Sequence, residues 1–207
     1  MNTYLLYDPA LNGDYTQLIL QQQYPTHRSL FAGTKDEGLD DVAPFIFQID
    51  GQFGQKIVQQ PLIELKASVF VHAKGPLEAV AAHFRPFIYQ KLKGREFYFR
   101  FWDARVLIKF LPTCDKEQIR TFFEDLDSLT MVEEMSSEEA RRYTHDYGRL
   151  LITKVPLNTI LGDNRAAMPA EASPTAPTAA KPVESTASAP AADEPEKPVK
   201  KRRTFLS

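Results

Sequence analysis

The segment from residue 94 to residue 107 constrains the fold of this 207-residue chain more than any other, because it predicts a strand that runs directly into a helix. In an extended backbone, successive side chains point to opposite faces. The two faces of this segment carry Phe97, Phe99 and Phe101 on one side, and Tyr98, Arg100 and Trp102 on the other. Large side chains on both faces predict a central strand with other elements packed on each side.

Asp103 stands where the N-cap of the following helix is expected, since Val106 and Leu107 begin an apolar pattern with helical spacing behind it. Arg100 and Arg105 flank this aspartate, and the cluster has two interpretations. In the structural one, Asp103 caps the helix and an arginine balances its charge. In the functional one, Arg100 stacks on a neighbouring aromatic ring and presents its guanidinium to a partner's carboxylate. The structural interpretation is favoured, and both stay open.

This segment and its surroundings resemble a family of adaptor, or chaperone, proteins of bacterial type VI secretion. The resemblance covers residues 3–135 and rests on the order and spacing of several blocks: Tyr4-Leu5-Leu6-Tyr7-Asp8, Ser29-Leu30-Phe31-Ala32-Gly33-Thr34, Val42-Ala43-Pro44-Phe45-Ile46-Phe47, His83-Phe84-Arg85-Pro86-Phe87, Gly94, and residues 99–107. The chain departs from the family pattern in three places. Ala104 replaces the usual proline, Pro86 intrudes after His-Phe-Arg, and the 123–126 region lacks the usual Gly-Pro.

The resemblance implies a non-enzymatic adaptor that binds a cognate effector and loads it onto the spike protein VgrG. The partner-binding candidates are Tyr98, Arg100, Trp102, Asp103, Arg105, His83 and Arg85. A small enzyme or a nucleic-acid-binding module is the alternative. The sequence does not identify the effector, its toxin activity or the stoichiometry of the complex.

Strand-like runs alternate with helical patterns, which predicts an α/β fold with a mixed β-sheet flanked by helices. The runs lie at 3–7, 44–49, 67–72, 96–102 and 148–154. We expect a single domain with a disordered C-terminal tail. Its parts are an adaptor-type domain at 1–135, an extension packed on it at 136–164, and the tail at 165–207.

Helix boundaries follow from capping signals between these runs. Asp14 with Gln17, and Asp115 with Gln118, have the spacing of capping boxes, and each predicts the start of a helix. A third helix is expected to begin at Pro76. Pro86 should kink or end this helix, because it removes a backbone hydrogen bond.

The tail is dominated by Ala, Pro, Ser, Thr and Glu, a composition that buries too little apolar surface to offset the entropy lost on ordering. It ends with Lys200-Lys201-Arg202-Arg203 followed by Thr204-Phe205-Leu206-Ser207. An extended tether with a basic and aromatic tip could serve as a docking peptide. A solubilising tail without a specific partner is the favoured alternative.

Composition narrows the function classes. The net charge of −2 argues against a protein that coats nucleic acid, so we expect no nucleic-acid partner. The single cysteine, Cys114, excludes a disulfide within the chain. We expect no secretory signal at the N-terminus and no membrane span, since no window approaches the ~20 apolar residues that a span needs. A cytoplasmic protein is therefore predicted.

The chain shows no catalytic constellation, and we predict neither a cofactor nor a metal. The four histidines are scattered, without metal-ligand spacing. Cys114 begins a helical pattern that could lower its pKa, yet no histidine lies near it in sequence, so an inert thiol is favoured over a reactive one. The aromatic content of 11% exceeds what a core of this size requires. A surplus at the surface would form the kind of apolar patch that an adaptor needs.

Overall fold

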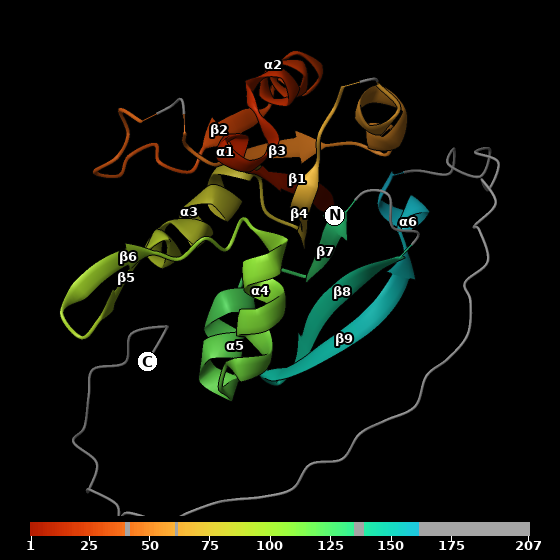
Figure 1. Cartoon of the computed structure of the whole chain (residues 1–207). Helices are drawn as coiled ribbons and strands as arrows, with labels where there is room; N and C mark the ends of the chain where they lie inside the picture. The colour runs from red at the N-terminus through yellow and green to blue at the C-terminus, as the bar shows by residue number, and fades with distance from the viewer. Residues whose placement is uncertain (40–41, 61, 135–138, 162–207) are drawn as a thin grey trace, which may run out of the picture.

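The computed structural model describes residues 1–39, 42–60, 62–134 and 139–161, which form one seven-stranded sheet with helices on its faces (Figure 1). The strand order is β2-β3-β1-β4-β7-β8-β9, and the described strand pairings are antiparallel. The strands of this sheet are β1 (Asn2–Tyr7), β2 (His27–Ser29), β3 (Phe45–Ile49), β4 (Lys66–Ala73), β7 (Ser128–Glu134), β8 (Glu139–Asp146) and β9 (Arg149–Pro156).

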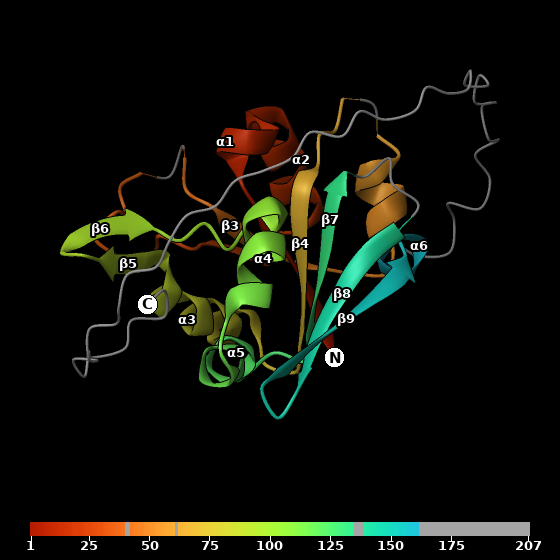
Figure 2. The same cartoon turned by 60° about the horizontal axis from the view of Figure 1, so that its bottom comes forward.

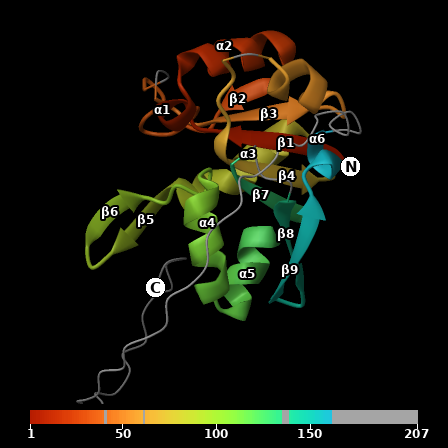
Figure 3. The same cartoon turned by 45° about the vertical axis from the view of Figure 1, so that its right-hand side comes forward.

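A separate two-stranded hairpin, β5 (Tyr89–Leu92) and β6 (Arg95–Tyr98), projects away from the sheet in all three views (Figures 1, 2 and 3). Lys93 and Gly94 form its turn with φ values of 51° and 77°, a pair of left-handed residues that suits the twist of a tight hairpin. The helical elements are α1 (Pro9–Asn12), α2 (Asp14–Gln23), η1 (Gly54–Val58), α3 (Leu77–Ile88), α4 (Ala104–Phe110), η2 (Leu111–Thr113), α5 (Lys116–Phe123) and α6 (Asn158–Leu161).

Helices cover both faces of the sheet (Figure 1). Cross-strand partners share a face, so Leu5, Phe47 and Phe70 lie together on one side. Phe53 beside η1 packs edge-on against Phe70 there, with ring centroids 5.7 Å apart. The opposite face packs against α3, α4 and α5. Its core includes Phe84, whose ring stacks on that of Phe101 at 4.8 Å.

The α/β class and a sheet flanked by helices are confirmed. The expected strands at 3–7, 44–49, 67–72 and 148–154 correspond to β1, β3, β4 and β9. Alternating strands and helices suggested a mixed sheet, whereas the described pairings are antiparallel. Two long strands, β7 and β8, were not expected, and they place β9 at the edge of the sheet.

The central strand expected at 96–102 is wrong. Residues 95–98 form β6 of the outer hairpin, with all four side chains exposed, because the Lys93–Gly94 turn pairs them with the segment just before them. Residues 99–103 then leave the extended conformation through two tight turns, in which the amide of Phe101 donates to Phe99 O and that of Asp103 to Arg100 O. The prediction of buried Phe99 and Phe101 still holds.

The capping signals have mixed outcomes. Asp115 and Gln118 form the expected reciprocal capping box at the start of α5. The box expected at Asp14 is wrong, because α2 begins after Gly13, which makes no side-chain cap. Helix α3 continues through Pro86 and ends two residues later, at Ile88.

Strand β8 pairs with β7, and β9 pairs with β8, so the residues described between 139 and 161 are continuous with the rest of the core. The division at 135 stays a prediction. The expected disordered tail at 165–207 lies outside the described residues. Within the described residues, no helix combines the length and the apolar character needed to cross a membrane.

Candidate functional site

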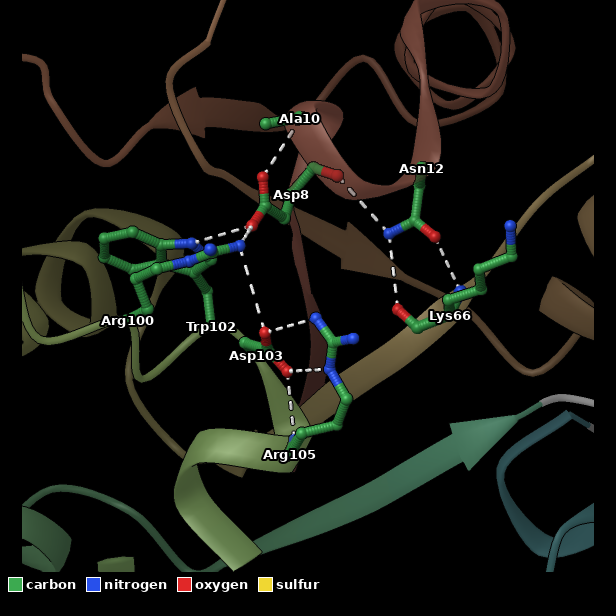
Figure 4. Close-up of polar contacts among 8 residues, drawn as sticks. All are labelled: Asp8, Ala10, Asn12, Lys66, Arg100, Trp102, Asp103 and Arg105. Atoms are coloured by element: carbon green, nitrogen blue, oxygen red, sulfur yellow. Dashed lines mark hydrogen bonds and ion pairs between the residues drawn. The ribbon is translucent and has the colours of Figure 1, made fainter.

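Asp8 organises the junction between the first strand and the segment that follows the hairpin (Figure 4). Its side chain is buried, with 4% of the residue exposed. Oδ1 accepts from the amide of Ala10 at 3.1 Å, which caps α1. Oδ2 accepts from Arg100 Nη2 at 2.5 Å and from Trp102 Nε1 at 3.2 Å. One buried carboxylate thus holds together residues that are 94 positions apart.

Asp103 is the N-cap of α4, as predicted, and accepts from the amide of Arg105 at 3.0 Å. The Arg105 side chain also binds it in a fork, with Nε donating to Oδ1 at 3.0 Å and Nη2 donating to Oδ2 at 2.8 Å. Arg100 Nη2 lies 3.8 Å from the same carboxylate, so it stands between Asp8 and Asp103. Two arginines therefore balance two buried aspartates. This arrangement supports the structural interpretation of the cluster.

Asn12 fastens the other side of the junction (Figure 4). Its Nδ2 donates to Asp8 O and to Lys66 O, each at 3.3 Å, and its Oδ1 accepts from the amide of Lys66 at 2.6 Å. The side chain thus joins the end of α1 to the backbone at the start of β4. The next residue, Ala67, has a φ of 50°, which the clamp helps to hold.

A second carboxylate, Asp36, ties the hairpin to the loop that precedes β3. Its Oδ2 accepts from the hydroxyls of Tyr89 and Tyr98, each at 2.7 Å. The hydrogen bonds from Tyr89 and Tyr98, with the nearby charge of Lys35, hold the pKa of Asp36 below its usual value. The same bond to Asp36, followed by burial, raises the pKa of Tyr98 to about 12.

Aromatic rings connect the two sites. Phe31 stacks on Tyr98, with centroids 5.9 Å apart, and meets Trp102 edge-on at 6.3 Å. Lys35 pairs with Glu96, and its Nζ lies over the Tyr89 ring at 4.5 Å. The loop from residue 30 to residue 39 and the hairpin therefore form one braced unit, which we call the hairpin surface.

The predicted partner-binding residues fall into two groups, those that are enclosed and those that reach solvent. Trp102 and Asp103 are buried, with 5% and 3% exposed. His83 is also enclosed: 5% of its side chain is exposed, and its Nε2 is 3.0 Å from Phe122 O. The remaining candidates reach solvent, namely Tyr98, Arg100, Arg105 and Arg85. Tyr98 belongs to the hairpin surface, while Arg100 and Arg105 are engaged by the buried aspartates.

Arg85 lies under the hairpin surface. The guanidinium carbon is 3.7 Å from the position that a Cβ of Gly33 would occupy, so the side chain reaches from α3 to the loop. Its buried Nε has no hydrogen-bond partner. The ion pairs formed by the described residues do not include Arg85.

Two residues central to these sites were missed by sequence reasoning. Asp8 directly precedes Pro9 and follows a strand, a pattern typical of an N-cap, and this signal could have identified it. Asp36 offered no such signal. It lies in a polar loop, and its partners are 53 and 62 residues away.

The described residues were also compared with the requirements of a metal site, a reactive thiol and a ligand pocket. No group of three His, Cys, Asp or Glu side chains there could hold a metal ion. Burial, with Asp115 nearby, raises the pKa of Cys114 to about 12, which supports the inert alternative for this thiol. A pocket of about 360 Å³ beside α4 and β8 and another of about 350 Å³ between α3 and the start of β7 contain none of the predicted site residues.

The comparisons with known proteins identify a family. Curated proteins and solved structures give no match to this chain. A family model described as a domain of unknown function, DUF4123, matches residues 3–121, which include both aspartate sites and the hairpin. This family is generally associated with type VI secretion effector adaptors. Because the match covers more than half of the sequence, the chain belongs to the DUF4123 family.

Proposed function

We propose that this protein is a non-enzymatic adaptor that binds a cognate type VI effector in the cytoplasm and delivers it to the VgrG spike. The observation that carries the proposal is the DUF4123 match over residues 3–121. An adaptor must hold its cargo by surface contacts and release it unchanged. Such a task requires an exposed surface on a rigid support rather than a reaction centre.

The hairpin surface has the physical properties that this task requires. Phe97 and Tyr98 are 36% and 46% exposed, although they belong to a chain with a large aromatic core. Asp36 and Lys35 restrain the hairpin, so a partner that binds there does not have to order it. The buried junction of Asp8 and Asp103 anchors the C-terminal end of the hairpin to the sheet.

The direct test is binding of the purified protein to any toxin and any VgrG-like protein whose genes lie beside its own. We expect a stoichiometric complex with a Kd on the order of micromolar or tighter. The effector mass should be the same before and after incubation. Deleting the adaptor gene should abolish secretion of this effector and leave other type VI substrates secreted. Unchanged secretion, or a covalent change in the effector, would contradict the proposal.

The tail provides a control for where the cargo binds. A variant limited to residues 1–165 should retain effector affinity, because the folded region contains the aromatic surface. Contacts of the basic 200–203 tip should weaken with salt, since charges are screened over ~10 Å at about 0.1 M. If the truncated variant lost effector binding, the cargo site would have to be assigned to the tail.

A further inference from the structure

We infer that the hairpin surface, together with Arg85, binds an extended acidic segment of the partner that also carries apolar side chains. This inference rests on the proposed function and specifies where and by what chemistry the effector is recognised. The surface comprises residues 30–39 and 89–98 and the Arg85 side chain beneath them. Three observations support it: unpaired cations, exposed aromatic side chains and a rigid support.

The cations are the first observation. Lys91, Lys93 and Arg95 line the hairpin, and its single carboxylate, Glu96, is already paired with Lys35. Lys91, Lys93, Arg95 and Arg85 make no ion pair with another described residue. Four positive groups are thus available to a ligand.

The sign of this charge is opposite to that of its surroundings. The hairpin surface and Arg85 contain five cations and three carboxylates, Asp36, Glu37 and Glu96, whereas residues 1–165 as a whole carry 19 cations and 22 carboxylates. Asp36 is occupied by two tyrosine hydroxyls and Glu96 by Lys35. A local positive surface on a negative body attracts a negative partner and orients its approach.

The apolar groups are the second observation. Phe97 shares one face of the hairpin with Arg95, and Tyr98 shares the other face with Lys91. Leu39 on the loop is 47% exposed. Phe31 stacks behind Tyr98 and prevents it from folding inward. Each face of the hairpin thus carries a cation and an aromatic ring. A partner segment that lies along the hairpin edge, with acidic and apolar side chains on both of its own faces, would place carboxylates on the lysines and arginines and apolar groups on the rings. Arg85, with its planar guanidinium, suits a carboxylate that reaches between α3 and the loop.

The support is the third observation. The hydroxyls of both hairpin tyrosines donate to one carboxylate, and the residues Lys93 and Gly94 adopt the left-handed backbone of a tight two-residue turn. The hairpin belongs to a separate sheet, so its strands have open edges in the described structure. An extended partner segment could therefore lie along the hairpin without displacing any strand of the main sheet.

The test uses the full chain and three fluorescein-labelled octapeptides. The first repeats Glu-Glu-Phe-Phe, which places both residue types on each face of the extended peptide, and the other two replace every glutamate with glutamine or with lysine. We expect the acidic peptide to bind at least about tenfold more tightly than the others, and its affinity to fall as salt rises from 50 to ~300 mM. Equal affinity for the three peptides would overturn the inference.

Matched variants locate the binding. The double substitution Lys91→Glu and Arg95→Glu should weaken the acidic peptide at least tenfold, and Phe97→Ser and Arg85→Gln about three- to fivefold each. Lys109→Glu on α4 and Leu18→Ser on α2 alter exposed side chains of the same types elsewhere, and they should change the affinity less than twofold. Thermal melts confirm that each variant is folded. Equal losses in the control variants would overturn the inference.

Binding assays with the effector distinguish a failure of this inference from a failure of the proposed function. If the wild-type protein binds its effector and the Lys91→Glu/Arg95→Glu variant binds it equally well, the hairpin assignment is wrong and the adaptor function stands. If the acidic peptide binds but no adjacent effector does, the surface chemistry stands and the proposed function is wrong. A wild-type dimer that the hairpin variants dissociate would assign the surface to a second copy of the chain and overturn the inference.

Discussion

Asp8 and Asp36 are two carboxylates that do similar chemistry in different surroundings. Asp8 accepts hydrogen bonds from Arg100 and from the indole N–H of Trp102, and Asp36 accepts hydrogen bonds from the hydroxyls of Tyr89 and Tyr98. Asp8 is 4% exposed, whereas Asp36 lies at the rim of the molecule. A buried carboxylate that loses its partners has no water to replace them, while one at the rim does. The Asp8 network should therefore determine stability, and the Asp36 network should determine how the hairpin is presented.

The comparison also separates the family motif from the proposed binding surface. The most distinctive residues, Arg100 to Arg105, are largely engaged in holding α4 and β1 together. The less distinctive residues of the hairpin and loop remain available to a partner. A recurring motif can thus mark the support of a site rather than the site.

Removing the Asp8 carboxylate is the largest perturbation. Asp8→Ala would leave the Trp102 N–H without its acceptor, free Arg100 beside Asp103 and uncap α1, so we expect a loss of about 3 kcal/mol in the free energy of unfolding. Denaturant unfolding followed by tryptophan fluorescence measures it, with Asp8→Asn as the milder control. A loss below about 1 kcal/mol would show that the junction does not stabilise the fold as proposed.

Acid should lower the stability of the main sheet more than that of the Asp36 network, because the sheet contains His72. This histidine is buried between Thr3 and Thr130. Burial, followed by the charge of Arg142, lowers its pKa from 6.5 to about 4. The unfolded chain therefore binds a proton more readily between these values. The His72 contribution is complete above pH 6.5 and is lost as the pH falls towards 4, by at most about 3 kcal/mol.

The Asp36 brace should persist across the same window, because the pKa of its carboxyl is lowered rather than raised. Urea unfolding at pH 7, 5.5 and 4.5 tests the difference, and His72→Gln should flatten the dependence. If His72→Gln has the same pH profile as the wild type, another group causes the acid sensitivity.

Asp103 should have a smaller effect than Asp8. Asp103→Ala removes the N-cap of α4 and the fork with Arg105, but the Arg105 side chain is 52% exposed and can be hydrated. We expect a loss of about 1–2 kcal/mol, and less for Asp103→Asn or Asp103→Ser, which can still cap. The melting temperature and effector affinity should be measured together. Unchanged stability with abolished binding would make the junction itself the binding surface.

The sequence predicts the parts of the fold that depend on local signals. The cap at Asp103, the box at Asp115 and Gln118, and the strands over 3–7 and 67–72 follow from residue types within a few positions. The strand at 96–102 was misplaced because aromatic alternation does not tell which sheet a strand joins. The turn at Lys93–Gly94, which decides that pairing, received no weight.

The candidate site was only partly predictable. Arg85 was identified through the family pattern and Tyr98 through the strand face that it was expected to share with Arg100 and Trp102, and the structure places both at the hairpin surface. Asp36 and the cations Lys91 and Lys93 were not identified, because their roles arise from pairing between a loop and a distant hairpin. Trp102 and His83 were candidates whose burial only the structure reveals.

The smallest effect on stability is expected at Asp36. Asp36→Asn removes a charge at the rim, and Tyr98→Phe removes one exposed hydroxyl, so each should shift the melting temperature by no more than about 2 °C.

The effect of Asp36→Asn on the titration of Tyr98 should be clear nonetheless. The pKa of Tyr98 is raised to about 12 mainly by its hydrogen bond to Asp36, and it should fall towards 10 in Asp36→Asn. NMR of ¹³C-labelled tyrosine follows this titration, with Tyr98→Phe assigning the signal and Tyr15, on α2, as the internal reference. Because the unbraced hairpin must be ordered on binding, affinity for the acidic peptide should also fall severalfold. A normal Tyr98 titration in the wild type would mean that the two carboxylates are not counterparts, and that the hairpin is not held by Asp36.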